Sequence, residues 1–138
     1  MYQQDYFIRV ILEFFKALSR ALAHQDMDKR SEAIHDLYRQ YLGSYEFYQN
    51  ATTEEAIEQI TTLYPEEQQY QRMEMLAELY YAEAEYRPQP IGETLLQRAL
   101  PLFELVDRHS GTYSLGRLEK IQSIHRRIHS GPDSQEEK

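Results

Sequence analysis

The sequence predicts an all-α fold, and three observations carry this prediction. Residues that favour helices dominate the composition, above all Ala, Leu, Glu, Gln and Arg. The strict alternation of apolar and polar residues that is typical of half-buried strands is absent. Only five glycines and five prolines occur among 138 residues, and several stand where a helix should begin or end. We expect five to six helices in a single domain over residues 1–130, followed by a polar, disordered tail over residues 131–138.

The first two helices are expected over residues 2–24 and 29–42. In the first, apolar residues at helical spacing, such as Phe14 and Leu18, form one broad face. Asp26 or Asp28 can cap the second helix, since carboxylates at this position accept hydrogen bonds from free backbone N–H groups. Gly43 then ends it, because glycine readily adopts the left-handed conformation that follows a helix.

Residues 44–50 are expected to form an aromatic linker, and the next two helices over 52–63 and 65–86. Thr52 and Glu55 have the spacing of a capping box, which predicts the start of the third helix. Pro65 suits the first turn of the fourth helix, and the carboxylates of Glu66 and Glu67 there are favoured by the helix dipole.

The last two helices are expected over 91–109 and 114–129. Pro101 lies inside the fifth helix and predicts a kink or break near residues 97–100. The sixth helix carries an apolar stripe that consists of Leu118, Ile121, Ile124 and Ile128.

The fourth helix is apolar on two sides. Tyr70, Met73 and Tyr81 belong to one side, whereas Leu76 and Leu79 point to the other. A helix with two apolar sides lies between other helices. We therefore place it at the centre, with helix pairs on both flanks, as a solenoid-like stack or a compact bundle.

The helix-pair pattern resembles the tetratricopeptide repeat (TPR). Its second-helix spacing, a small residue four positions before a large one, occurs at Ala33 and Leu37 and again at Ala99 and Phe103. The first-helix pattern is approximated by Met73, Leu76, Ala77 and Tyr80. The chain also resembles small bacterial TPR-like proteins of unknown function, over most of residues 1–129. The resemblance implies TPR-like helical hairpins, a C-terminal capping helix and binding to other proteins.

The acidic charge is concentrated in the middle of the chain. Residues 51–90 hold nine glutamates but only two arginines, whereas the segments before and after are nearly neutral. Glu74, Glu78 and Glu85 lie close to one line on the fourth helix, which in a TPR hairpin faces a groove. We expect a groove that binds a basic peptide or helix of a partner protein, although a strip of charge is also how a helix meets water.

Tyrosine is unusually abundant, with 12 copies. Its ring is apolar, its hydroxyl is polar and it loses little entropy on ordering, so it favours binding surfaces as well as the edges of a core. Tyr81 beside the acidic line, together with Tyr45 and Tyr48 in the linker, is expected to contribute to partner binding.

His125 and His129 have the i, i+4 spacing that lets two imidazoles share a metal ion. Residues 126 and 127 between them are both arginine, and two adjacent cations repel a divalent metal. We expect no metal and no cofactor here, and a His-based metal-binding protein or enzyme stays an alternative.

Composition and the absence of known motifs narrow the classes of function that this chain can have. A net charge of −8 disfavours nucleic acid and anionic membranes as partners, and no apolar segment is long enough to span a bilayer. The absence of cysteine and of a signal sequence predicts a cytoplasmic protein. No nucleotide-binding or nucleophile motif occurs. We therefore expect a non-enzymatic interaction or scaffold module, with a self-associating homodimer as an alternative.

Overall fold

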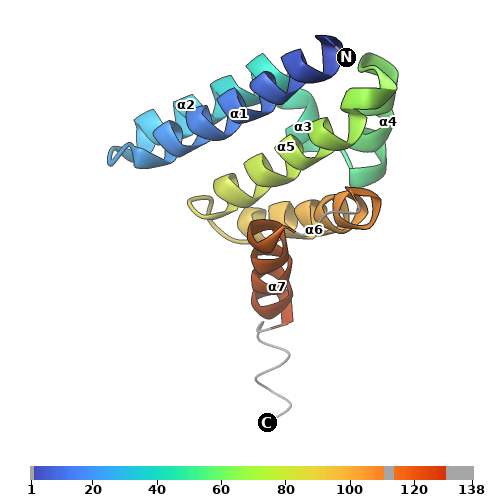
Figure 1. Cartoon of the computed structure of the whole chain (residues 1–138). Coiled ribbons are helices and arrows are strands. Elements are labelled where there is room, and N and C mark those ends of the chain that lie inside the picture. The colour runs from blue at the N-terminus through green and yellow to red at the C-terminus, as the bar shows by residue number, and fades with distance from the viewer. Residues whose placement is uncertain (1, 111–113, 130–138) are drawn as a thin grey trace.

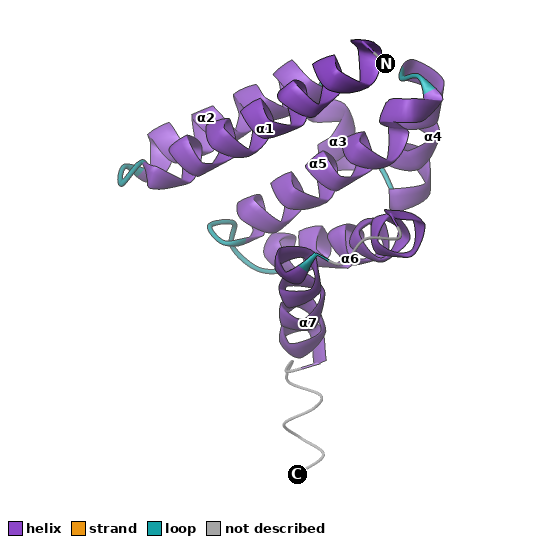
Figure 2. Cartoon of the chain, viewed as in Figure 1, coloured by secondary structure: helices purple, strands orange, loops and turns teal. Residues whose placement is uncertain are grey.

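The computed structural model describes residues 2–110 and 114–129, and the side chains of residues 2–6 are left out. These residues form helices joined by short turns, with no strand among them, which confirms the all-α prediction (Figure 2). The predicted tail lies outside the described residues. The helices are α1 (Tyr2–Ala23), α2 (Met27–Leu42), α3 (Glu46–Asn50), α4 (Thr53–Leu63), α5 (Glu66–Ala84), α6 (Ile91–Ser110) and α7 (Leu115–His129).

The described residues thus contain seven helices rather than five to six. The extra helix is α3, which lies in the segment expected to be a linker. Its start is held by Ser44, whose hydroxyl accepts a hydrogen bond of 3.0 Å from the backbone N–H of Phe47. Its end is held by Asn50, whose amide donates to the backbone oxygen of Glu46 at 2.9 Å. One turn of helix is too short for hydrophobic periodicity to reveal it.

Local capping signals locate the ends of α2 and α4. Asp26 Oδ1 accepts a hydrogen bond of 2.9 Å from the backbone N–H of Asp28, and Gly43 ends α2 with φ of 88°. At α4, Thr52 Oγ1 accepts from the Glu55 backbone N–H at 3.1 Å, and Glu55 Oε1 accepts from the Thr52 backbone N–H at 2.9 Å. The predicted capping box is confirmed.

Pro65 and Pro101 lie at the start of α5 and inside α6. Pro65 is the residue immediately before α5 rather than part of its first turn. Pro101 lies inside α6, yet the helix is continuous from Ile91 to Ser110, so the alternative of a break near residues 97–100 is wrong. Ala99, Leu102 and Phe103 beside the proline are fully buried, and their packing holds the helix in place.

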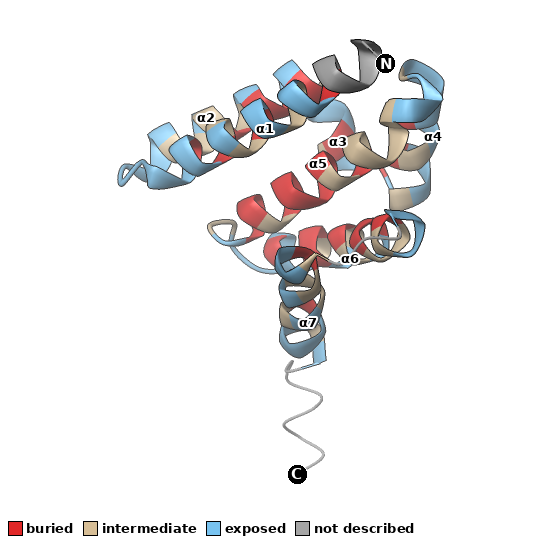
Figure 3. Cartoon of the chain, in the orientation of Figure 1, coloured by how far each residue is buried: buried red, intermediate tan, exposed pale blue. Residues whose placement is uncertain are grey.

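Helix α5 lies at the centre, as predicted. Helices α1 and α2 run side by side along one flank and α6 covers another, while α4 packs across the N-terminal half of α5 (Figure 1). Ten of its 19 residues are buried, including Glu78 and Glu83. Figure 3 shows the buried residues gathered on α5 and on the faces of α2 and α6 that meet it. No helix among the described residues is both long and apolar enough to cross a membrane.

Candidate interaction surfaces

The acidic strip, defined as Glu74 and Glu78 of α5 together with Glu85, which directly follows this helix, lies beside the chain's own helix α7. The main packing partner of α7 is α6. Each carboxylate of the strip forms an ion pair with a cation of α7. The pairs are Glu74 Oε2 with Arg117 Nη1 at 3.1 Å, Glu78 Oε1 with Lys120 Nζ at 3.0 Å, and Glu85 Oε1 with Arg127 Nη1 at 2.9 Å. The carboxylates that the sequence predicts to bind a basic partner are therefore paired with a basic helix of the same chain.

Tyr81 lies under the same helix. Its hydroxyl donates a hydrogen bond of 3.0 Å to the Ser123 hydroxyl oxygen. The Lys120 ammonium and the Arg127 guanidinium lie 6.0 Å and 5.8 Å from the centre of its ring. A cation within about 6 Å of an aromatic face is attracted by the ring quadrupole. Tyr81 thus adds an aromatic contact to the charged ones.

The apolar part of the α7 contact is small. Ile124 is fully buried, whereas Ile121 and Ile128 are only partly buried. Arg117 is the other buried residue of α7, and it pairs with Asp107 of α6 as well as with Glu74. Charges and hydrogen bonds therefore dominate the contact of α7 with α5, while α7 packs chiefly against α6.

Glu78 is the least exposed member of the acidic strip, with a residue exposure of 5%. Burial raises the pKa of Glu78, because a carboxylate loses hydration inside the protein, and the Lys120 ammonium acts in the opposite direction. The charge of Glu78 therefore depends on the Lys120 ammonium that α7 places beside it.

Tyr45 and Tyr48 lie on the opposite side of α5 from the acidic strip. There a second glutamate, Glu83, is completely buried. It accepts four hydrogen bonds: from the Tyr38 hydroxyl at 2.8 Å, the Tyr45 hydroxyl at 2.8 Å, Gln49 Nε2 at 2.8 Å and Arg87 Nη1 at 2.6 Å. We call these five residues the Glu83 cluster. It ties α2 and α3 to the C-terminal end of α5.

No role is predicted for Glu83 in the sequence analysis. One feature of the sequence could have indicated its burial: Glu83 stands between Ala82 and Ala84, and Arg87 follows four residues later. A carboxylate flanked by small apolar residues, with a cation at i+4, fits a buried ion pair on an inward face.

Tyr45 and Tyr48 serve different purposes. Tyr45 is partly exposed, donates to Glu83 and stacks on His35, with 3.8 Å between ring centroids. Tyr48 is fully buried, so its side chain belongs to the core and is not offered to a partner in this structure. Of the six predicted binding residues, four gather under α7 and two lie across α5 from them.

His125 and His129 face each other on α7 with parallel rings 5.8 Å apart. His125 Nε2 also lies 3.6 Å from Glu104 Oε2. Among the described residues, no group of three or more His, Cys, Asp or Glu side chains is placed to hold a metal ion. A tetrahedral zinc site needs three or four such ligands.

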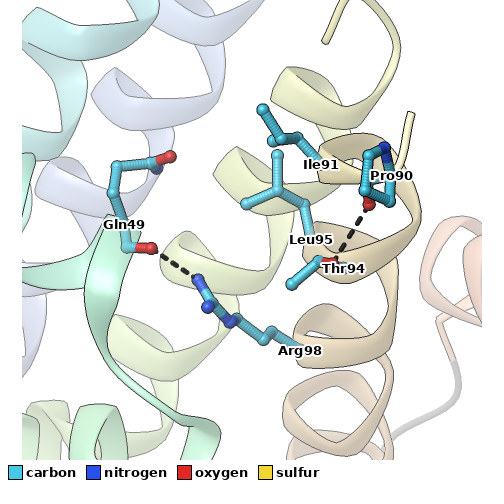
Figure 4. A pocket seen from close by; sticks show the side chains of 6 residues that line it. All are labelled: Gln49, Pro90, Ile91, Thr94, Leu95 and Arg98. Carbon is cyan, nitrogen blue, oxygen red and sulfur yellow. Dashed lines mark hydrogen bonds between the residues drawn. The ribbon is translucent and has the colours of Figure 1, made fainter. Parts of the chain in front are cut away.

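A shallow pocket of about 150 Å³ lies between α3 and the start of α6 (Figure 4). Its polar groups are already engaged, since Arg98 Nη1 donates to the Gln49 backbone oxygen at 2.7 Å and the Thr94 hydroxyl donates to the Pro90 backbone oxygen at 3.0 Å. Ile91 and Leu95 form its apolar wall. Pockets for small ligands usually exceed about 300 Å³, so this one is small for that role.

Comparison with family models, with curated proteins and with solved structures finds no match to this chain.

Proposed function

We propose that this chain is a non-enzymatic protein-interaction module whose acidic strip, together with Tyr81, binds a basic amphipathic helix of a partner protein. The observation that carries the proposal is the docking of α7, itself a basic helix, onto this surface through three ion pairs. Helix-in-groove binding uses an apolar row and complementary flanking charges, and the α7 contact has both.

The composition of the contact supports exchange between α7 and a partner. Only Arg117 and Ile124 of the described α7 residues are buried, so little apolar surface holds the helix down. The Glu85–Arg127 pair is exposed to water, and pairs of this kind contribute less than about 1 kcal/mol. A partner helix with a similar row of cations and a larger apolar row would replace α7 at little net loss.

The tether sets the affinity that a partner needs. A segment on a short connection has an effective concentration on the order of 1 mM at its own site. Suppose that α7, as a separate peptide, bound the acidic strip with a Kd of about 10 µM. At an effective concentration of about 1 mM, the tethered helix would then weaken the apparent affinity of a competing partner roughly 100-fold. The surface would then respond only to partners that bind more tightly than α7 or are locally concentrated.

The architecture supports the same role. The contacts within the pairs α1–α2 and α5–α6 support TPR-like helical hairpins as part of the proposal, in which α7 would be the C-terminal capping helix. Helical hairpin stacks present extended surfaces to other proteins. A cytoplasmic location is part of the proposal.

A labelled peptide with the sequence of residues 114–129 tests this function. It is titrated into wild type, into an Arg117→Ala, Lys120→Ala variant that weakens the α7 contact, and into an Arg126→Ala control. Arg126 is exposed, so the control should bind like wild type. We expect the double variant to bind the peptide roughly 100-fold more tightly than wild type, since its site is vacated.

The acidic strip supplies the specificity control. A Glu74→Lys, Glu85→Lys change in the α7-weakened background should abolish peptide binding while leaving the helical circular dichroism unchanged. The proposal fails if hydrogen exchange shows α7 released in the weakened variant and the peptide still does not bind.

A further inference from the structure

Helix α1 carries a largely apolar row of positions beside the face that packs into the core. Ile8, Leu12 and Leu22 are 53%, 58% and 39% exposed. Between them, Phe15 is partly buried and packs against the core, and Ser19 is polar and exposed. The five positions, which we call the α1 outer stripe, are separated by alternating steps of four and three residues. This is the a/d spacing of a helix that packs lengthwise against another helix.

The α1 outer stripe is distinct from the face that packs inside the protein. Phe7, Phe14, Leu18 and Ala21 form the buried face. At 100° per residue, the centre of the outer stripe lies about 120° around the helix from the centre of the buried face. A terminal helix of a stack normally has a polar outer face. Helix α1 therefore has apolar surface beyond what its own domain uses.

Basic residues follow one edge of the stripe. Arg9, Lys16 and Arg20 are exposed and lie about 80–120° around the helix from the stripe centre, whereas Glu13 lies further back. None of the three cations forms an ion pair within the described part of the chain. In a chain with a net charge of −8, this edge is locally positive.

We propose that the α1 outer stripe is a second docking surface, and that its occupant is an amphipathic helix of another protein with an apolar a/d row and an acidic edge. The apolar row would cover Ile8, Leu12 and Leu22. The acidic edge would pair with Arg9 and Lys16, which stand at the flanking e position beside this a/d row, as flanking charges do in coiled coils, while Arg20 lies further around the helix. This surface is separate from the acidic strip under α7, and the proposal does not depend on the function proposed for that strip.

The charges favour this occupant over a second copy of the chain or a membrane. An antiparallel pair of α1 helices about the middle of the stripe would bring the Lys16 side chains of the two copies together, and like charges there repel. A narrow a/d row is typical of a helix–helix seam, whereas helices that lie on membranes have broad apolar faces. The overall negative charge also disfavours an anionic bilayer.

Two matched peptides test the proposal on the full-length protein. Both are 21-residue helices with Leu at a and d; one carries Glu and the other Lys at e and g. Fluorescence anisotropy should show the Glu peptide binding at least about 10-fold more tightly than the Lys peptide, with the difference reduced at high salt. Equal affinity for the two peptides, or no binding of the Glu peptide, would overturn the proposal.

Four further measurements distinguish this surface and its proposed occupant from the alternatives. Leu12→Ser should abolish binding, whereas Leu115→Ser should not, although both leucines are 58% exposed. Arg9→Glu with Lys16→Glu should reverse the preference toward the Lys peptide, and Arg108→Glu with Arg126→Glu, which changes the net charge equally, should not. Light scattering that shows a dimer dissociated by Leu12→Ser would replace the proposed occupant with a second copy. Leu12-dependent binding to phosphatidylserine vesicles would replace it with a membrane.

Discussion

The Tyr38 hydroxyl donates a hydrogen bond of 2.8 Å to Oε1 of Glu83, and both side chains are completely buried. This bond joins α2 to α5 at the centre of the protein. Burial and the negative charge of Glu83 raise the pKa of Tyr38, so its hydroxyl stays protonated and remains a donor. All four hydrogen bonds to this carboxylate can form only when α2 and α3 occupy a narrow range of positions relative to α5, so the cluster fixes how these helices pack.

We expect Glu83→Gln to destabilise the protein strongly. The amide keeps the size of the carboxylate but loses its charge, which leaves Arg87 without its anion and weakens the bonds from Tyr38 and Tyr45. Breaking a buried ion pair from one side lowers the free energy of unfolding by about 3 kcal/mol or more. Urea unfolding followed by circular dichroism measures the loss.

Glu85→Gln is the matched control for this change. Glu85 lies two residues away and also pairs with an arginine, but its side chain is 51% exposed. The expected loss is less than about 1 kcal/mol. Similar losses for Glu83→Gln and Glu85→Gln would contradict the role assigned to the Glu83 cluster.

Two buried tyrosines should respond differently to loss of the hydroxyl. Tyr80 donates a hydrogen bond of 2.7 Å to the Tyr48 backbone oxygen, so Tyr80→Phe should lower the free energy of unfolding by about 1 kcal/mol. The Tyr48 hydroxyl has no partner among the described residues, and burial raises its pKa to about 12. Because a buried hydroxyl without a partner is unfavourable, Tyr48→Phe should leave stability unchanged or increase it. Thermal unfolding of both variants provides the comparison, and a larger loss for Tyr48→Phe would refute it.

Glu78 should make stability depend on pH in a defined direction. Its pKa in the folded protein is raised above the ordinary value of 4.5, chiefly by burial. The folded state therefore holds the Glu78 proton more tightly than the unfolded chain does. The resulting stabilisation is complete below the ordinary pKa and is lost as the pH rises through the raised pKa.

Glu78→Gln isolates this contribution, because glutamine has no proton to lose. Relative to the variant, wild type should become less stable as the pH rises from 4.5, and the difference should level off above the raised pKa. Urea unfolding of both proteins across this range gives the difference directly. A wild type that gains stability over the variant with rising pH would show that the Lys120 charge outweighs burial.

Arg117 is expected to hold α7 in place. It is 6% exposed, pairs with Glu74 and Asp107 and donates to the Ser110 hydroxyl, so Arg117→Ala removes two ion pairs and a further hydrogen bond at once. Each such bond contributes about 1.5–3 kcal/mol, and the amides of α7 should therefore exchange with solvent at least about tenfold faster, while those of α5 keep their protection. Arg126→Ala removes the same charge from an exposed position of α7 and should change neither. Equal exchange of α7 in the two variants would contradict the assignment.

Features that depend on neighbours along the chain were predictable from the sequence. The all-α class, the capping box at Thr52 and the stop at Gly43 rest on contacts within four residues, and all three are confirmed. The central position of α5 was predictable too, because its two apolar sides require helices on both flanks. Helix α3 was not predicted, because five residues are too few to show the helical period of apolar residues.

The partners of the charged residues were decided by the tertiary structure. The helical period places Glu74, Glu78 and Glu85 on one face of α5, and by itself this face is equally compatible with water, a partner protein or another part of the chain. The cations that pair with them lie 42 or 43 residues later, and no local rule predicts that spacing. Glu83 lies on the opposite face of α5, where it is completely buried and accepts hydrogen bonds from α2 and from the segment that contains α3. Helix propensity determined the elements because it acts over a few residues, whereas the environment of each carboxylate depends on which distant helix packs beside it.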